Sequence, residues 1–140
     1  MSAPTNVRFP DAVDSELAAY ARNSGAAKST VVIEALREWL RMQAHPGVHF
    51  VRTVTGARRA NLVGGPQVWT VAESWQQHSA AERSVAQVAH SVGLTPHQVE
   101  SALRYWAEHR SEIDDLLQQH AVSQDSALAA WERRRALDAG

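Results

Sequence analysis

The feature that most limits the possible folds is a very short strand-like segment near the start of the chain. In residues 4–9, Val7 and Phe9 would lie on one face of a strand and Asn6 and Arg8 on the other. A single strand of this length can neither pair its backbone polar groups nor cover its apolar face. We therefore expect it to pair antiparallel with its copy in a second chain. Such a two-stranded ribbon fits the major groove of DNA.

Two amphipathic segments follow that are too small to enclose a core by themselves. The pattern predicts a helix over residues 11–24, ended by Gly25, and a second helix from about residue 27 or 29 to residue 43. We expect four such helices, two from each chain, to pack under one ribbon. The residues expected in this core include Tyr20, Leu36 and Trp39.

Four blocks within residues 5–41 follow the order and spacing of a known family. They are Asn6-Val7-Arg8-Phe9-Pro10-Asp11, Leu17-Ala18-Ala19-Tyr20-Ala21, Gly25-Ala26-Ala27-Lys28-Ser29 and Glu34-Ala35-Leu36-Arg37-Glu38-Trp39-Leu40. In these blocks the chain resembles the Arc/MetJ/CopG ribbon-helix-helix repressors, which include many bacterial antitoxins. The resemblance implies a β-α-α module that binds DNA as a homodimer.

The same resemblance assigns the DNA contacts. It implies that Asn6 and Arg8 read bases, and these side chains suit adenine and guanine respectively. It also implies that the backbone amides at the start of the second helix hold a phosphate; these belong to Lys28, Ser29 and Thr30. Family members often cap that helix with Ser or Thr where this chain has Ala27, so capping is expected to pass to Ser29. The alternative is that Asn6 and Arg8 form the solvated outer face of a purely structural ribbon.

Composition excludes several classes of protein. The net charge of −1 gives no general preference for nucleic acid, so any DNA-binding face must be local. The chain has no cysteine, and its seven histidines show no recognised ligand spacing, so we expect no metal and no other cofactor. No apolar run is long enough to cross a bilayer and the first residues lack the features of a signal peptide, which favours a cytoplasmic protein.

After a break at Pro46-Gly47, a second domain is expected. Its expected elements are strands over 48–54 and 60–63 around a turn at 55–57, helices over 68–78, 84–92 and 95 or 96 to 109, and a segment from 111 that breaks near Ser123 before a helix over 126–137. Residues 85–99 have the spacing of a helix-turn-helix motif. If this unit read DNA, the leading residues would be Thr95, His97, Gln98 and Ser101, but a purely structural three-helix core is the favoured alternative.

Residues 45–117 also resemble a known type of domain. The resemblance is carried by His45-Pro46-Gly47-Val48-His49-Phe50, by residues 64–69, by Ala102-Leu103-Arg104-Tyr105-Trp106-Ala107 and by Ser111-Glu112-Ile113-Asp114. In these blocks the chain is similar to VapB-like antitoxin domains, which are largely of unknown function and are often encoded beside a PIN-like toxin. A departure occurs at Gly64-Gly65-Pro66-Gln67, where members usually have a Gly-Thr or Gly-Arg stretch.

The end of the chain carries a compact set of interface-type residues. In a helix, Leu128, Trp131 and Arg135 fall on one face, and Arg133 and Arg134 adjoin it. Arginine and tryptophan are the residue types that anchor interfaces. PIN-type nucleases hold metal ions with carboxylates, so these five residues are the expected toxin-binding set. The alternatives are a solvated terminal helix, or packing of Leu128 and Trp131 onto the middle domain.

Together these observations predict a mainly α protein with short β elements. Residues 1–44 would form an N-terminal ribbon-helix-helix (β-α-α) dimer, residues 45–120 a β-hairpin with a helix-turn-helix-like helical domain, and residues 121–140 a helical tail. The expected function is a type II antitoxin that binds operator DNA as a homodimer, represses its own operon and neutralises a PIN-like ribonuclease. The alternative is a stand-alone repressor whose second domain oligomerises or senses a ligand. No nucleophile–base pair, phosphate loop or catalytic acidic cluster is recognisable, so an enzyme is not expected.

Overall fold

The computed structural model describes residues 3–140, which divide into two compact units. Unit 1 ends at Gln43, and unit 2 runs from Ala44 to Gly140. This division lies one residue from the boundary expected from the sequence. Residues 121–140, expected as a separate third part, belong to unit 2.

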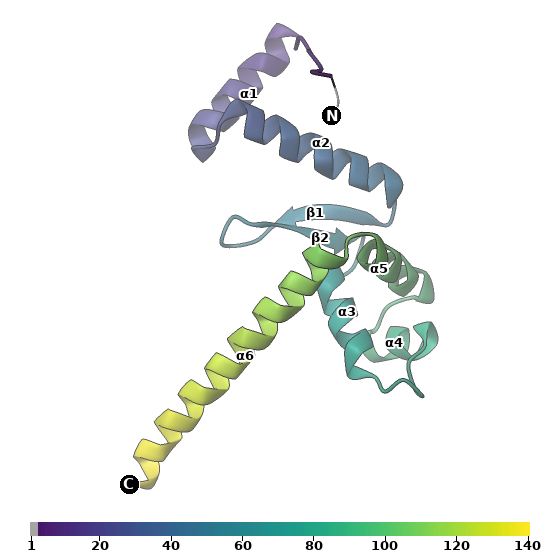
Figure 1. Ribbon diagram of the computed structural model, residues 1–140, viewed down its shortest axis with the longest axis vertical. Helices are drawn as coiled ribbons and strands as arrows, with labels where there is room; N and C mark the ends of the chain where they lie inside the picture. Colours follow the sequence, from purple (N-terminus) through teal and green to yellow (C-terminus); the bar gives the residue numbers. More distant parts are fainter. Residues whose placement is uncertain (1–2) are drawn as a thin grey trace. The chain divides into compact units, whose positions relative to one another are not determined.

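Unit 1 consists of two helices, α1 (Asp11–Ser24) and α2 (Lys28–Ala44), joined by a tight turn (Figure 1). The turn depends on Gly25, whose φ of 73° lies in the left-handed region that side chains with a Cβ rarely adopt. Both helices and the stop at Gly25 are therefore confirmed.

The expected N-terminal strand is absent from the described residues 3–10, which have no regular secondary structure. A β-strand requires hydrogen bonds to a neighbouring strand, and the only sheet among residues 3–140 is a two-stranded hairpin in unit 2. The predicted β-α-α arrangement is therefore wrong for this chain. Its strands come after two helices rather than before them.

Unit 1 buries almost none of its apolar side chains. Ala21 is its single buried residue among those described, at 8% exposure. Leu36, Trp39 and Leu40 on α2 are each 53% exposed, and Tyr20 on α1 is 44% exposed. The core expected around these residues is not formed within one chain, because two helices offer too little surface to cover each other's apolar faces.

Unit 2 opens with an antiparallel hairpin of β1 (Val48–Arg52) and β2 (Arg58–Leu62). The hairpin was expected, and its register places Val48 opposite Leu62. Both of these side chains are buried, at 2% and 0% exposure, so the hairpin contributes one face to the core of the unit.

Three helices supply most of the rest of this core: α3 (Val68–Gln77), α4 (Val85–Val92) and α5 (Pro96–Glu108) (Figure 1). Local signals set the start of two of them. The Ser84 hydroxyl accepts a hydrogen bond from the Gln87 amide at the start of α4, and Thr95 and Gln98 form a capping box at the start of α5. The buried core residues are Val48, Ala60, Leu62, Val68, Val71, Ala72, Val88, Ala89, Val99, Ala102, Tyr105, Trp106 and Ile113.

The last helix, α6 (Arg110–Ala139), is continuous over 30 residues. The predicted break near Ser123 is wrong, because residues 110–139 contain neither glycine nor proline and a lone serine weakens a helix only slightly. The first third of α6 packs on the rest of unit 2: Ile113 is buried, and His120 Nε2 lies 3.1 Å from the Glu73 carboxylate on α3. Among residues 3–140, no helix has both the length and the apolar character needed to cross a bilayer.

Candidate functional site

The part of α6 beyond His120, which we call the distal helix (residues 121–139), is almost entirely exposed. Every residue in it is exposed except Ala129, which is half-buried. Figure 1 shows it running clear of the other helices of unit 2. At 1.5 Å per residue the distal helix is about 28 Å long. It presents a long helical surface that no other part of the described unit 2 covers.

One face of the distal helix carries the expected interface residues. Leu128 and Trp131 are each 54% exposed, so the alternative in which they pack onto the middle domain is not what the structure has. The guanidinium carbon of Arg135 lies 5.1 Å from the centroid of the Trp131 ring, within reach of a cation–π interaction. The helix therefore brings these three side chains together as one stripe.

The three consecutive arginines have different surroundings. Arg134 Nη1 lies 2.6 Å from the Asp138 carboxylate, and both side chains are about two-thirds exposed. Arg135 stacks on Trp131. Arg133 has no ion pair with any residue in the described range 3–140, so its charge is the least compensated of the three. An exposed pair such as Arg134–Asp138 stabilises the helix little and is easily exchanged for another partner.

The direction of α6 is fixed by an elbow at its start. His109, between α5 and α6, has φ −130° and ψ 52°, which ends one helix and begins the next. Across the elbow, Trp106 Nε1 donates a hydrogen bond to Asp114 Oδ1 at 2.8 Å. Arg110 pairs with the other Asp114 oxygen at 3.3 Å and lies over the Trp106 ring at 5.2 Å. These contacts hold the base of α6 against α5.

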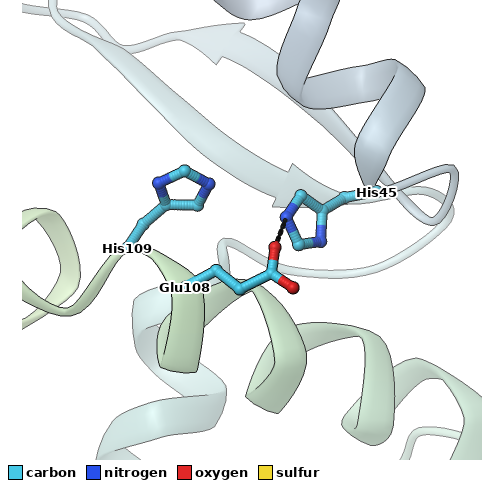
Figure 2. A group of neighbouring side chains, drawn as sticks. All are labelled: His45, Glu108 and His109. Carbon is cyan, nitrogen blue, oxygen red and sulfur yellow. Dashed lines mark ion pairs between the residues drawn. The ribbon is translucent and has the colours of Figure 1, made fainter.

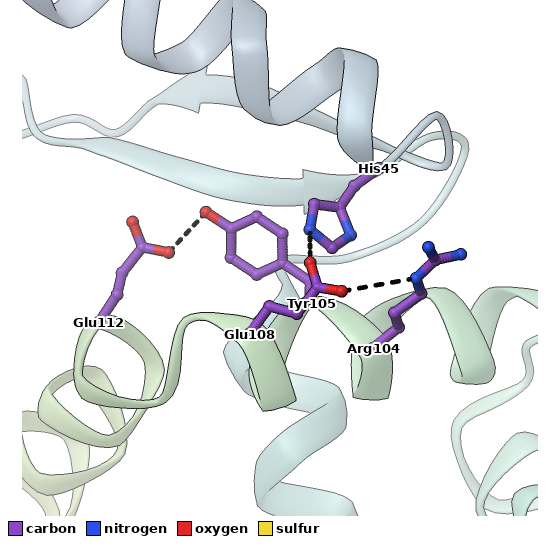
Figure 3. A network of polar contacts seen from close by, with 5 residues as sticks. All are labelled: His45, Arg104, Tyr105, Glu108 and Glu112. Atoms are coloured by element: carbon purple, nitrogen blue, oxygen red, sulfur yellow. Dashed lines mark hydrogen bonds and ion pairs between the residues drawn. The ribbon is translucent and has the colours of Figure 1, made fainter.

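A second hydrogen bond across the elbow has a buried donor. Tyr105 is fully buried, and its hydroxyl donates to Glu112 Oε2 at 2.6 Å (Figure 3). A hydrogen bond to a charged acceptor is among the stronger contacts in a protein. Two side-chain hydrogen bonds thus join α5 to α6 at the elbow, and both help to set the direction of the distal helix.

The residues expected to bind DNA in unit 1 lie on two segments, the one before α1 and the first turn of α2. Asn6 and Arg8 are exposed on the irregular segment before α1. Lys28 begins α2, but its ammonium lies 3.6 Å from the Asp14 carboxylate of α1, which offsets part of its charge. Ser29 lies inside the first turn of α2, so the expectation that it caps the helix is wrong.

Thr30, the last of the expected phosphate contacts, is also exposed in the first turn of α2. The Ala27 carbonyl accepts a hydrogen bond from the Val31 amide at 3.1 Å, which places Ala27 at the cap position. The backbone amides of Lys28, Ser29 and Thr30 therefore precede the first intrahelical hydrogen bond. These are the amides that the resemblance assigns to a phosphate.

Two of the four residues named for DNA reading by the α4–α5 pair, Thr95 and Gln98, make hydrogen bonds within unit 2. The Gln98 side chain accepts from the Thr95 amide at 3.0 Å and donates to the Val63 carbonyl at 3.4 Å. Val88 on α4 and Val99 on α5 are fully buried in the shared core. These contacts favour the structural three-helix alternative over DNA reading by α5.

The hydrogen-bonded residues of the elbow lie within two blocks of the second resemblance, but their hydrogen bonds across a turn were not predicted. Glu112 and Asp114 follow their partners by seven and eight residues, a spacing that would be lined up in a straight helix but here spans a turn. The available signal was the pair of acidic residues at the start of an expected segment, which could be interpreted only as favourable to a helix N-terminus.

No protein-family model, curated protein or solved structure matches this chain. The two resemblances noted from the sequence therefore depend on the quoted residues alone.

Proposed function

We propose that this chain is the antitoxin of a type II toxin–antitoxin pair. In this proposal unit 1 forms a homodimer that binds operator DNA and represses the operon. The distal helix of α6 binds a PIN-like ribonuclease and neutralises it. The observation that carries the proposal is the exposure of Leu128, Trp131 and Arg133–Arg135 on the distal helix, which the rest of the described unit 2 does not cover.

The exposed apolar face of α2 supports dimerisation through unit 1. Ile33, Leu36, Trp39 and Leu40 are all more than half exposed in the single chain. A soluble domain seldom leaves a cluster of large apolar side chains in water. A second copy of unit 1 supplies an equally apolar surface of matching size, as in a two-fold dimer where the same patch meets itself.

The DNA-binding part of the proposal is supported by the resemblance of residues 5–41 and by the exposure of Asn6 and Arg8. In a dimer both side chains occur twice, related by two-fold symmetry, which suits an operator with inverted half-sites. The overall charge is near neutral, so a small number of specific contacts must carry the affinity rather than a basic surface.

The toxin-binding part is supported by charge and shape. A helix of about 28 Å that exposes two large apolar side chains on one face, Leu128 and Trp131, can lie in a groove of a partner. The arginine side chains of residues 133–135 would be attracted to the carboxylates of a nuclease centre. A buried tryptophan and a paired arginine could each contribute on the order of 2 kcal/mol to such an interface.

The test compares the full chain with a chain that ends at His120, both co-expressed with the ribonuclease encoded beside it. We expect the full chain to restore growth and the shortened chain to fail. Both should bind a DNA fragment from their own promoter region equally well, because the distal helix is not part of unit 1.

A matched control is Leu137→Ala, which alters an exposed apolar residue of the same helix outside the stripe. It should restore growth as the full chain does. The antitoxin proposal would be rejected if the shortened chain neutralised the ribonuclease fully, or if no neighbouring ribonuclease bound the full chain. In the latter case DNA binding alone would support the stand-alone repressor.

A further inference from the structure

Three side chains that are potential metal ligands meet near the elbow of unit 2. His45 lies just before β1, Glu108 is the last residue of α5, and His109 lies between α5 and α6. One ligand atom from each lies within 4.8 Å of the other two. Figure 2 shows the two rings and the carboxylate arranged around a common space.

The buried histidine lacks the hydrogen bond that its position demands. The His45 side chain is 3% exposed, and its Nε2 atom has no hydrogen-bond partner among the described residues. The nearest carboxylate oxygen, Glu108 Oε2, is 2.7 Å away, close enough for an ion pair but without the geometry of a hydrogen bond. A buried nitrogen that is left unsatisfied destabilises the fold, so the atom needs a partner in this space.

We propose that His45, Glu108 and His109 bind one divalent zinc ion. Two imidazole nitrogens and one carboxylate oxygen are a donor set that zinc accepts in proteins, with a fourth position left for water. Zinc–ligand distances of about 2.0–2.2 Å in a tetrahedral site place neighbouring ligand atoms about 3.3–3.5 Å apart. His45 Nε2 and Glu108 Oε2 are 2.7 Å apart, and one ligand atom of each residue lies within 4.8 Å of the others, which is close to that spacing.

The surroundings of the cluster suit a bound cation. Arg104 Nε lies 3.8 Å from Glu108 Oε1, the oxygen that does not face His45, so the carboxylate is held from the far side (Figure 3). Such a partner orients a ligand without occupying the metal position. The Tyr105 ring packs against both histidine rings, at centroid distances of 5.0 and 4.5 Å, which fixes their planes.

Access is open on one side, because the Glu108 side chain is 50% exposed. An ion can therefore enter from solvent, and a water molecule can complete its coordination. The bound ion would link the segment before β1, through His45, to the elbow between α5 and α6, through Glu108 and His109. This site is separate from the proposed DNA and toxin contacts and does not depend on either.

The experiment uses the full chain, treated with a chelator and dialysed, then titrated with zinc chloride in a calorimeter. We expect one ion per chain and a rise in melting temperature with zinc, since binding to the folded state stabilises it. Magnesium chloride should give neither signal, because this ion prefers sites with several oxygen ligands.

Substitutions separate the proposed site from adventitious binding. Glu108→Gln and His109→Gln should each weaken zinc binding by more than about 100-fold, beyond what loss of a supporting partner costs. His120→Gln is the matched control, because it removes a histidine that faces a single carboxylate, that of Glu73. It should leave the zinc affinity unchanged.

His45→Gln should also abolish the binding, but it alters a buried residue and can affect folding. The partly exposed Glu108 therefore decides the matter if that variant does not fold. The proposal is overturned if the chain binds no zinc in a one-to-one ratio. It is also overturned if binding survives Glu108→Gln, or if His120→Gln weakens binding as much as His109→Gln does.

Discussion

Deleting residues 121–140 should leave the free energy of unfolding of unit 2 almost unchanged. The deletion removes no buried residue, and it keeps Ile113 and the His120–Glu73 contact that attach α6 to the core. Changes at exposed positions usually alter stability by less than about 0.5 kcal/mol. If Leu128 and Trp131 instead packed on the core, each would contribute about 1.5–3 kcal/mol, and their joint loss would be several times larger.

The measurement is equilibrium unfolding in urea, followed by the fluorescence of Trp69, Trp75 and Trp106, which both chains retain. Ile113→Ala in the full chain serves as the reference for a real loss of packing and should cost about 2–5 kcal/mol. A loss above about 2 kcal/mol in the shortened chain would refute the reasoning. Combined with unchanged ribonuclease binding, it would show that the distal helix is structural.

Three further predictions concern single residues. Arg8→Ala should weaken binding to the operator by about 1–3 kcal/mol in a salt-controlled titration, and an equal loss on unrelated DNA would contradict base reading. If unit 1 dimerises as proposed, Leu36→Asp should give a monomer in sedimentation velocity, because it places a charge on the apolar face of α2, whereas Leu137→Asp on the distal helix should leave the dimer intact. Tyr105→Phe should lower the free energy of unfolding by about 1.5–3 kcal/mol through loss of the bond to Glu112. Glu112→Gln, which keeps an acceptor, should cost less in the same urea titration.

The helices and the hairpin could be predicted because their signals are local. Gly25 and Gly93 end α1 and α4 with φ values of 73° and 70°, a conformation that glycine adopts without strain. The capping box of Thr95 and Gln98 marks the start of α5 within four residues. The strand-like segments on either side of the turn at Gly56 likewise predict the two strands of the hairpin.

Two features that sequence patterns do not reveal share a physical origin, because both depend on contacts between distant residues or between chains. Residues 4–9 have a strand-like pattern, but within this chain they have no neighbour to pair with. The cluster of His45, Glu108 and His109 joins positions more than sixty residues apart, and only the folded unit 2 brings them together. No spacing rule for metal ligands covers such a set.

The break predicted near Ser123 failed for a different reason. The residues around Ser123 are polar, but a serine in a helix weakens it only slightly and no glycine or proline lies nearby. Propensity is a weak guide at such positions, and the helix continues.

The exposure of the distal helix also bears on how long the chain survives in a cell. A helix of this length that is not packed against a core is only marginally stable, so it opens locally at little cost in free energy. Proteases cut backbone that has opened, at a rate set by how often it opens. Degradation of the free chain should therefore begin beyond His120. A partner bound along that helix would hold it closed and prolong the lifetime of the whole chain.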